Sequence, residues 1–182
     1  MAERVIPEFH QVEPRLSLVH FPPVQTKIER AVDAIKFVCR NILNESYRER
    51  LIGIYCDCQL HPVCYSVIAE GDEIHVDTRI QDILTPALLY GVSRIILIHN
   101  HPSGSGAPSE NDYKFSYNMY HRCMDFGMYL MDSIIMPCGQ NPDDIKFTSL
   151  AFEKEEENPW YQYELQVQAK NKQKAAAAES TT

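Results

Sequence analysis

Two histidines and one aspartate within residues 98–112 carry the clearest chemistry in this sequence, because their spacing suits a metal ion. His99 and His101 lie at the end of an apolar run that is typical of a buried strand. Residues i and i+2 of a strand point to the same side, so both imidazoles can chelate one ion. A loop of Gly, Ser and Pro follows, and Asp112 falls in the first turn of the helix expected after it. Its carboxylate can therefore supply a third, anionic ligand.

This donor set predicts a catalytic zinc ion. Two imidazoles and one carboxylate leave the fourth position of a tetrahedral site open for water, as in zinc enzymes. Imidazole ligands favour zinc over magnesium, which prefers oxygen. Zinc makes its water acidic enough to form hydroxide at neutral pH, so the site also needs a group that carries the proton. Ser109 with Asp112 is by itself a common helix-capping pattern, and a histidine pair by itself is common on surfaces. Their conjunction indicates a site.

The complete spacing resembles a known family. The pattern H-x-H-x7-S-x2-D, formed by His99, His101, Ser109 and Asp112, matches the motif of the JAMM (MPN+) zinc metalloproteases. The fuller sequence H-N-H-P-S-G, then P-S, then D, resembles the RadC-like JAB domains within that family. The resemblance extends over about residues 26–150. It implies an α/β (α+β) fold of the JAMM/MPN type, similar to cytidine deaminases, with helices flanking a mixed β-sheet.

The resemblance also implies a proton carrier. In RadC-like proteins a glutamate precedes an apolar strand, and an aspartate lies eight residues after that glutamate. Glu49, the apolar run 51–56 and Asp57 fit this spacing, so Glu49 is assigned as general base and later general acid. Glu45 is the competing candidate. The resemblance further implies that Ser109 helps to hold the water or to stabilise the tetrahedral oxyanion.

The activity implied by the resemblance is that of a metallopeptidase-type hydrolase with one Zn²⁺ per chain, held by His99, His101 and Asp112. Glu49 takes a proton from the water, the carbonyl of a peptide, isopeptide or related amide bond is attacked, and Glu49 returns the proton to the leaving amine. The expected substrate is a peptide or protein, with a ubiquitin-like tail as one candidate. The alternative is a non-catalytic protein-interaction module on the same fold, associated with DNA repair or mobile elements. The intact ligand set favours the enzyme.

Two positions depart from the family pattern. The family commonly has Asp-His where this chain has Asp132-Ser133, and a closing Ser-Phe where it has Ser149-Leu150. Neither departure belongs to the metal set, so they bear on substrate contacts.

Other metal or nucleophile patterns are weaker. The spacing C-x-C-x2-H-x2-C at residues 56–64 is not a usual structural zinc pattern, and a hairpin turn is expected there. A zinc deaminase needs H-x-E and P-C-x-x-C, which the sequence lacks. A cysteine hydrolase at Cys123 or Cys138 has no supporting motif. The remaining histidines are expected to be structural or on the surface: His10, His20, His61, His75 and His121.

Composition limits the class of protein. The chain has 182 residues and a net charge of −8, which fits one domain with short extensions and counts against nucleic acid as the main partner. Its apolar stretches fall far short of the roughly 20 residues that span a bilayer. The first residues do not resemble a secretory signal, so a cytoplasmic location with reduced cysteines is expected. The sequence assigns no oligomeric state.

The elements that must position these residues follow from periodicity and capping signals. The domain is expected at 26–150, after an N-terminal extension at 1–25 and before a C-terminal one at 151–182. Strands are predicted at 16–20, 51–56, 65–69, 73–76 (after a turn at Gly71-Asp72), 94–99, 128–136 and 146–149. Helices are predicted at 26–43, 78–91 (kinked by Pro86), 109–127 and 153–169, the last docked on the domain, with disorder from 170 to 182.

Overall fold

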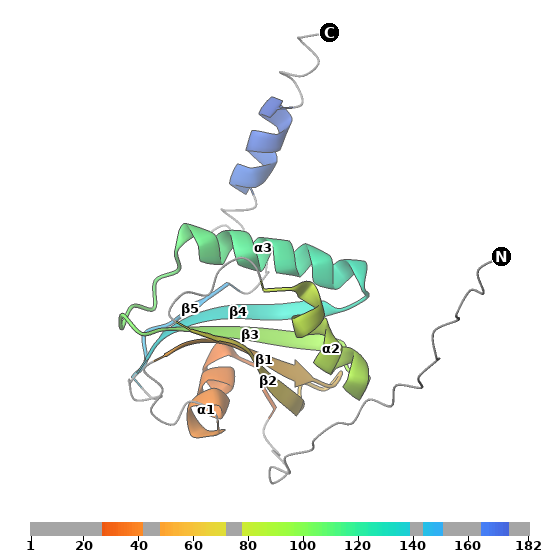
Figure 1. Ribbon diagram of the computed structural model, residues 1–182, viewed down its shortest axis with the longest axis vertical. Helices are drawn as coiled ribbons and strands as arrows, with labels where there is room; N and C mark the ends of the chain where they lie inside the picture. The colour runs from red at the N-terminus through yellow and green to blue at the C-terminus, as the bar shows by residue number, and fades with distance from the viewer. Residues whose placement is uncertain (1–26, 42–47, 72–77, 139–143, 151–164, 175–182) are drawn as a thin grey trace, which may run out of the picture.

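A five-stranded mixed sheet with helices on both faces forms the body of the protein (Figure 1). The computed structural model describes residues 27–41, 48–71, 78–138, 144–150 and 165–174. The sheet order is β2-β1-β3-β4-β5. The predicted fold class, a mixed sheet flanked by helices, is confirmed. The elements are α1 (Ala31–Asn41), β1 (Glu49–Cys56), β2 (Pro62–Gly71), α2 (Ile80–Tyr90), β3 (Arg94–His101), α3 (Glu110–Asp125), β4 (Tyr129–Pro137) and β5 (Thr148–Ser149).

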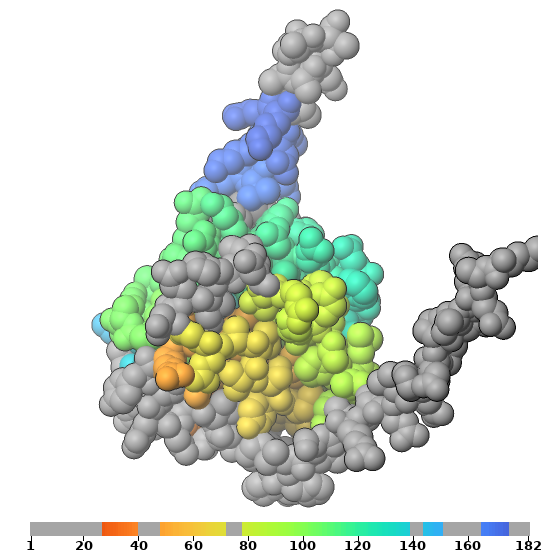
Figure 2. All heavy atoms as spheres, in the orientation of Figure 1, coloured from red at the N-terminus to blue at the C-terminus, as the bar shows by residue number. Residues whose placement is uncertain are grey.

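The sheet is mixed because one crossover interrupts its antiparallel pairs. β1 pairs antiparallel with β2 and β3, and β4 pairs antiparallel with β5. β3 and β4 are parallel, and α3 connects them. A parallel pair needs such a crossover because the chain must return to the same end of the sheet. β2 is an edge strand, and it lies on the face toward the viewer in Figure 2.

Two apolar clusters cover the two faces of the sheet, as expected for strands that are apolar on both alternations. One cluster packs under α1, and the other packs under α2 and α3. The first contains Ile35, Val38, Ile52, Ile54, Ile96, Ile98, Ile134 and Met136. The second contains Leu51, Tyr55, Ile83, Leu84, Ile95, Leu97, Met119 and Cys123.

The hairpin predicted at the cysteine-rich segment is confirmed, since residues 57–61 join β1 to β2. β2 is longer than the predicted strand 65–69, and its described partner is β1. The turn predicted at Gly71-Asp72 and the strand at 73–76 reach residues outside the described ranges. So does the strand predicted at 16–20.

Two predicted helix starts are wrong. α1 begins at Ala31 rather than at residue 26, and the Arg30 backbone N–H donates to the Asp33 carboxylate at 3.0 Å. α2 has Arg79 at its N-cap, without a side-chain cap, so Thr78 forms no capping box. The α2 stop is as predicted.

At the α2 stop, Gly91 adopts a left-handed conformation with φ of 65° that glycine tolerates without a Cβ clash. The helix includes Pro86 within its span.

Residues 165–174 form a helix that projects from the body (Figure 1) and is exposed over nearly all of its length. The sequence predicts disorder from residue 170, but the helix continues to 174, because Gln, Ala and Lys are good helix formers. The rest of the helix predicted at 153–169 lies outside the described residues. No helix among the described residues is long and apolar enough to cross a membrane.

Candidate metal centre

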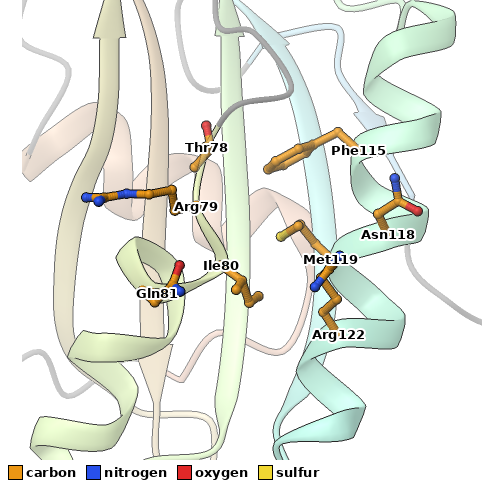
Figure 3. Close-up of a pocket in the computed structure, with 8 residues that line it drawn as sticks. All are labelled: Thr78, Arg79, Ile80, Gln81, Phe115, Asn118, Met119 and Arg122. Atoms are coloured by element: carbon orange, nitrogen blue, oxygen red, sulfur yellow. The ribbon is translucent and has the colours of Figure 1, made fainter.

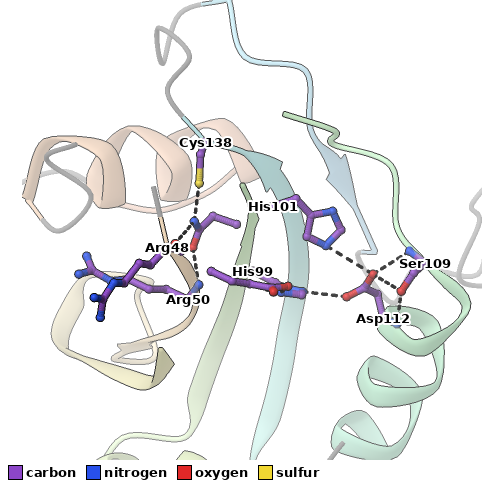
Figure 4. Close-up of polar contacts among 9 residues, drawn as sticks. Arg48, Arg50, His99, His101, Ser109, Asp112 and Cys138 are labelled. Atoms are coloured by element: carbon purple, nitrogen blue, oxygen red, sulfur yellow. Dashed lines mark hydrogen bonds and ion pairs between the residues drawn. The ribbon is translucent and has the colours of Figure 1, made fainter. Parts of the chain in front are cut away.

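The two histidines of the motif end β3 on the face covered by α3. Their neighbours Ile95 and Leu97 pack in the cluster under α2 and α3, and side chains alternate along a strand. The imidazole rings of His99 and His101 have centroids 4.7 Å apart and stand nearly perpendicular, at 87°. The i, i+2 spacing thus brings both rings to one place (Figure 4).

Asp112 reaches the same place from the first turn of α3. The Ser109 backbone N–H and hydroxyl donate to its Oδ2 at 2.7 and 2.6 Å, and the Asp112 N–H donates back to the Ser109 hydroxyl at 3.2 Å. Asp112 Oδ1 lies 2.8 Å from His99 Nδ1, and Oδ2 lies 3.6 Å from His101 Nε2. The Asp112 side chain is 8% exposed. One side chain therefore caps the helix and contacts both imidazoles.

Glu49 comes from the first position of β1. The antiparallel register pairs Arg50 with Asn100 and Leu51 with His99, so Glu49 falls beside the end of β3. Its Oε1 lies 2.6 Å from His99 Nε2. His99 is thus placed between two carboxylates, Glu49 on one ring nitrogen and Asp112 on the other. Glu45, the competing candidate, lies outside the described residues.

The local fields favour an anionic Asp112. Burial alone raises the pKa of Asp112, but the hydrogen bonds with His101, His99 and Ser109 outweigh it and hold the pKa well below its usual range. The hydrogen bond with Asp112 raises the pKa of His101 against the opposing effect of burial, and the charge of Glu49 adds to the rise. Asp112 is therefore a carboxylate at any working pH, as a metal ligand must be.

The donors fit a metal ion. Ligand atoms of Glu49, His99 and His101 all lie within 4.8 Å of one another, so these three side chains can hold one ion. The sequence predicts Asp112 as the third ligand, and its carboxylate contacts both imidazoles. Imidazole nitrogens with carboxylate oxygens form a donor set that suits zinc. The structure thus gathers all five predicted site residues, Glu49, His99, His101, Ser109 and Asp112, at one end of the sheet. Figure 4 shows His99, His101, Ser109 and Asp112 together.

The loop between the histidines and α3 is held by the segment around β5. The Thr148 hydroxyl donates to the Gly106 carbonyl oxygen at 2.8 Å. A Cβ on Gly106 would collide with the carbonyl of Lys146, so the two backbones meet where only glycine fits. This contact fixes the path by which Asp112 returns toward β3.

The segments that depart from the family pattern, Asp132-Ser133 and Ser149-Leu150, form contacts that join β4 to its neighbours. The Ser133 and Ser116 hydroxyls are 2.7 Å apart and join β4 to α3. The Ser149 hydroxyl donates to Asp132 Oδ2 at 2.7 Å and joins β5 to β4. Ser133 therefore belongs to a buried structural contact in this chain.

A pocket of about 360 Å³ lies between the start of α2 and the middle of α3 (Figure 3). Figure 3 shows Phe115 and Met119 pointing from α3 toward the start of α2. Phe115 is three residues after Asp112, so the pocket begins about one helical turn from the metal centre. Its lining is mixed polar and apolar: Thr78, Arg79, Ile80, Gln81, Phe115, Asn118, Met119 and Arg122.

The competing sites gain no support in the described residues. Among these residues the side chains placed closely enough to hold a metal ion are Glu49, His99 and His101, and the group includes no cysteine. Burial raises the pKa of Cys56 to about 12, and of Cys64 and Cys123 to about 11, so these thiols are poor ligands and nucleophiles.

The remaining described histidines have structural contacts. His61 contacts the Asp57 carboxylate at 3.2 Å, and the ring of His121 packs against Tyr117 and Tyr120. His10, His20 and His75 lie outside the described residues.

One residue near the site has a role that spacing rules did not identify. Asn100 stands between the two histidines of the motif, and its side chain is completely buried. It hydrogen-bonds the backbone of Arg48 and Arg50, on both sides of Glu49. The sequence signal was its place inside the H-N-H motif, which gives no indication of these partners.

Comparisons with known proteins agree on one family. A sequence model of the RadC-like JAB domain matches residues 28–153, which include all five site residues. Over 93 residues the chain is 33% identical to a UPF0758 protein of Aquifex aeolicus, covering 51% of this chain and 40% of that protein. Over 94 residues it is 34% identical to a UPF0758 protein of Streptococcus sanguinis, covering 52% and 41%. Over 133 residues it is 30% identical to one from Coprothermobacter proteolyticus, covering 71% and 54%. The chain thus spans 40 to 54% of the length of these curated relatives.

Proposed function

The chain belongs to the RadC-like JAB domain family, and we propose that it is a zinc-dependent hydrolase of peptide, isopeptide or related amide bonds. The observation that carries the proposal is that Glu49 on β1, His99 and His101 on β3, and Asp112 on α3 contact one another through their side chains. Two imidazoles and two carboxylates in a partly buried place are costly unless a cation balances them. A divalent ion there would neutralise the two carboxylates.

We assign the two carboxylates different roles on the basis of their surroundings. Ser109 holds Asp112 through two hydrogen bonds to one carboxylate oxygen, which suits a fixed ligand. Glu49 contacts His99 from the first position of its strand and has the more exposed side chain, at 16% against 8% for Asp112. A proton carrier has to face water and substrate. Glu49 therefore serves as the base, and His99, His101 and Asp112 serve as ligands.

A bound zinc ion would supply an acidified water and would polarise the substrate carbonyl. Glu49 accepts the proton of the attacking water and passes it to the leaving amine. Ser109 fixes the orientation of Asp112, and its hydroxyl, once turned away from that carboxylate, stabilises the developing oxyanion.

The substrate in this proposal is a peptide or protein, and the pocket beside Phe115 offers a recess for one of its side chains. A ubiquitin-like tail is one candidate. The net charge of −8 speaks against nucleic acid as the main partner. We place the protein in the cytoplasm, where its six free cysteines stay reduced.

Metal analysis and a substrate screen test the proposal together. The purified protein is expected to hold about one zinc ion, and His101→Ala to lose it. Zinc-loaded protein is screened against peptide, isopeptide and small amide substrates, with Glu49→Gln as the blank. Glu49→Gln is expected to retain zinc and to lose hydrolysis, whereas Glu45→Gln retains both.

Three results would contradict the proposal in different ways. A wild type without metal affinity removes its basis. Loss of hydrolysis in Glu45→Gln, with Glu49→Gln still active, makes Glu45 the base. A protein that binds zinc and cleaves nothing fits the non-catalytic interaction module instead.

A further inference from the structure

Asn100 lies between the two site histidines but faces the opposite side of the sheet. Side chains alternate along β3, and the neighbouring Ile98 packs in the cluster under α1. None of the Asn100 surface is exposed. A buried primary amide must find partners for its donors and its acceptor, so packing alone does not account for it.

The Asn100 amide holds the chain on both sides of Glu49. Its Oδ1 accepts a hydrogen bond from the Arg50 backbone N–H at 2.9 Å, and its Nδ2 donates to the Arg48 carbonyl oxygen at 2.9 Å. Nδ2 also lies 2.6 Å from the Cys138 sulfur (Figure 4). Glu49 is the residue between the two backbone contacts.

An amide suits this place because it donates and accepts in one plane, like a peptide group. Arg50 and Asn100 are the first residue pair of the β1–β3 ladder. The Asn100 side-chain amide therefore supplies hydrogen bonds to β1 at the end of the ladder, where backbone pairing stops. Aspartate would keep an acceptor for Arg50 and lose the donor to Arg48. Alanine would leave both backbone groups without this partner.

We propose that Asn100 is a positioning residue, which holds the backbone of Glu49 so that its carboxylate stays beside His99. The inference rests on the proposed function, in which Glu49 is the base. In this role Asn100 acts indirectly, through its hydrogen bonds to the main chain of Arg48 and Arg50.

The test uses the full chain loaded with Co²⁺, whose visible absorption reports the surroundings of the ion. Asn100→Ala and Asn100→Asp are expected to bind Co²⁺ at the wild-type ratio, because the ligands are intact, with a spectrum shifted in the direction seen in Glu49→Gln. For whichever substrate the zinc protein cleaves, kcat falls about 10- to 100-fold with little change in KM. Adding Asn100→Ala to Glu49→Gln is expected to shift the Co²⁺ spectrum no further than Glu49→Gln does alone, because both changes act on the same carboxylate.

Cys138→Ala is the matched control. It removes the sulfur contact of the Asn100 amide and leaves both backbone hydrogen bonds, so it is expected to keep the wild-type spectrum and kcat. Wild-type behaviour of both Asn100 variants, an equal loss of kcat in Cys138→Ala, or a further shift of the Co²⁺ spectrum in the double variant would overturn the positioning role. A wild type that takes up no Co²⁺ contradicts the proposed function instead.

Hydrogen exchange decides the matter if neither Asn100 variant folds. In the wild-type protein the Arg50 N–H is expected to exchange as slowly as that of Gly53, in the middle of β1, because Asn100 holds it. Rapid exchange at Arg50 with slow exchange at Gly53 would overturn the inference.

Discussion

Asp112 serves both the helix and the site with one carboxylate, whose Oδ2 also lies 3.6 Å from His101 Nε2. Its Oδ2 accepts two hydrogen bonds from Ser109, which closes the capping box at the start of α3. Its Oδ1 faces His99. The positive end of the helix dipole stabilises an anion at this position. A capping pair and a ligand are therefore compatible interpretations of Ser109 and Asp112, because the capping box is what aims the carboxylate.

Ser109→Ala separates these two tasks. The change removes the hydroxyl that donates to Asp112 and accepts from its N–H, so we expect a loss of about 0.5–2 kcal/mol in stability, as for other N-cap deletions. Zinc affinity is expected to fall about 10- to 100-fold, because the ligand loses its orienting partner. Denaturant unfolding of the metal-free protein measures the first effect, and competition with a chelator measures the second.

Ser105→Ala is the control for this prediction, because the Ser105 hydroxyl accepts from the Ala107 N–H in the same loop. It is expected to leave zinc affinity unchanged. Equal zinc affinity in Ser109→Ala and wild type would show that the serine does not orient the ligand.

Spacing along the sequence pointed to His99, His101 and Asp112 because these residues lie within 14 positions of one another and follow strand and helix periodicity. His99 and His101 meet because strands alternate, and Asp112 joins them because a short loop returns α3 to the strand end. Asn100 has partners 52 and 38 residues away, at Arg48 and Cys138. No periodicity encodes such contacts, so the role of the amide emerges from strand pairing alone.

The capping pattern in the sequence predicted the wrong start for α2, where Arg79 pairs with Asp82 instead. Ser109 and Asp112 form a capping box at the start of α3. Thr78 and Gln81 have the same spacing, but they form no capping box at the start of α2. α2 instead begins after Arg79, whose guanidinium pairs with Asp82 three residues later. A capping pattern has only two defined residues and therefore recurs by chance. The apolar positions of α2 and the glycine at its end, Gly91, locate this helix better.

The β1–β2 hairpin depends on one carboxylate. Asp57 Oδ1 accepts from the backbone N–H groups of Gln59 and His61 at 2.8 and 2.9 Å, and Leu60 in this turn has a positive φ of 66°. The His61 N–H is the main cause that lowers the pKa of Asp57, against the opposing effect of burial. The turn thus uses the charged form of Asp57 to hold a strained backbone.

Asp57→Ala is expected to destabilise the protein in a pH-dependent way. A carboxyl whose pKa is lower in the folded state stabilises the fold above its unfolded pKa, and this contribution is lost as pH falls through the folded pKa. The midpoint of denaturation should therefore be lower in the variant at pH 7, with the gap narrowing on acidification below about pH 4. Urea unfolding at several pH values measures it.

Asp82→Ala provides the comparison, because its carboxylate forms an exposed pair with Arg79 and such pairs contribute little. A smaller loss is expected there. A constant gap between wild type and Asp57→Ala from pH 7 to pH 3 would mean that the charge of Asp57 does not hold the turn.

At the scale of the molecule, the two faces of the sheet carry different parts of the candidate site. The face under α2 and α3 carries the candidate metal centre, and the face under α1 carries Asn100, whose amide hydrogen-bonds the main chain on both sides of Glu49. Apolar strands with both faces covered were predictable from composition of the runs 51–56 and 94–99. The strand order was not, because pairing Arg50 with Asn100 is a long-range choice that burial alone does not specify.

The described core and the site end by Leu150, which is fully buried, while the helix at 165–174 is exposed over nearly all of its length. A chain ending at residue 153 is therefore expected to keep its zinc content and to melt within about 2 °C of the full chain, since the described residues that it loses, 165–174, are nearly all exposed. A chain ending at residue 144 lacks β5 and the buried Ile145 and Leu150, and should fail to fold. Thermal unfolding by circular dichroism with metal analysis compares the three chains. A drop of many degrees for the chain ending at 153 would mean that later residues help to stabilise the domain, which contradicts the division proposed at residue 150.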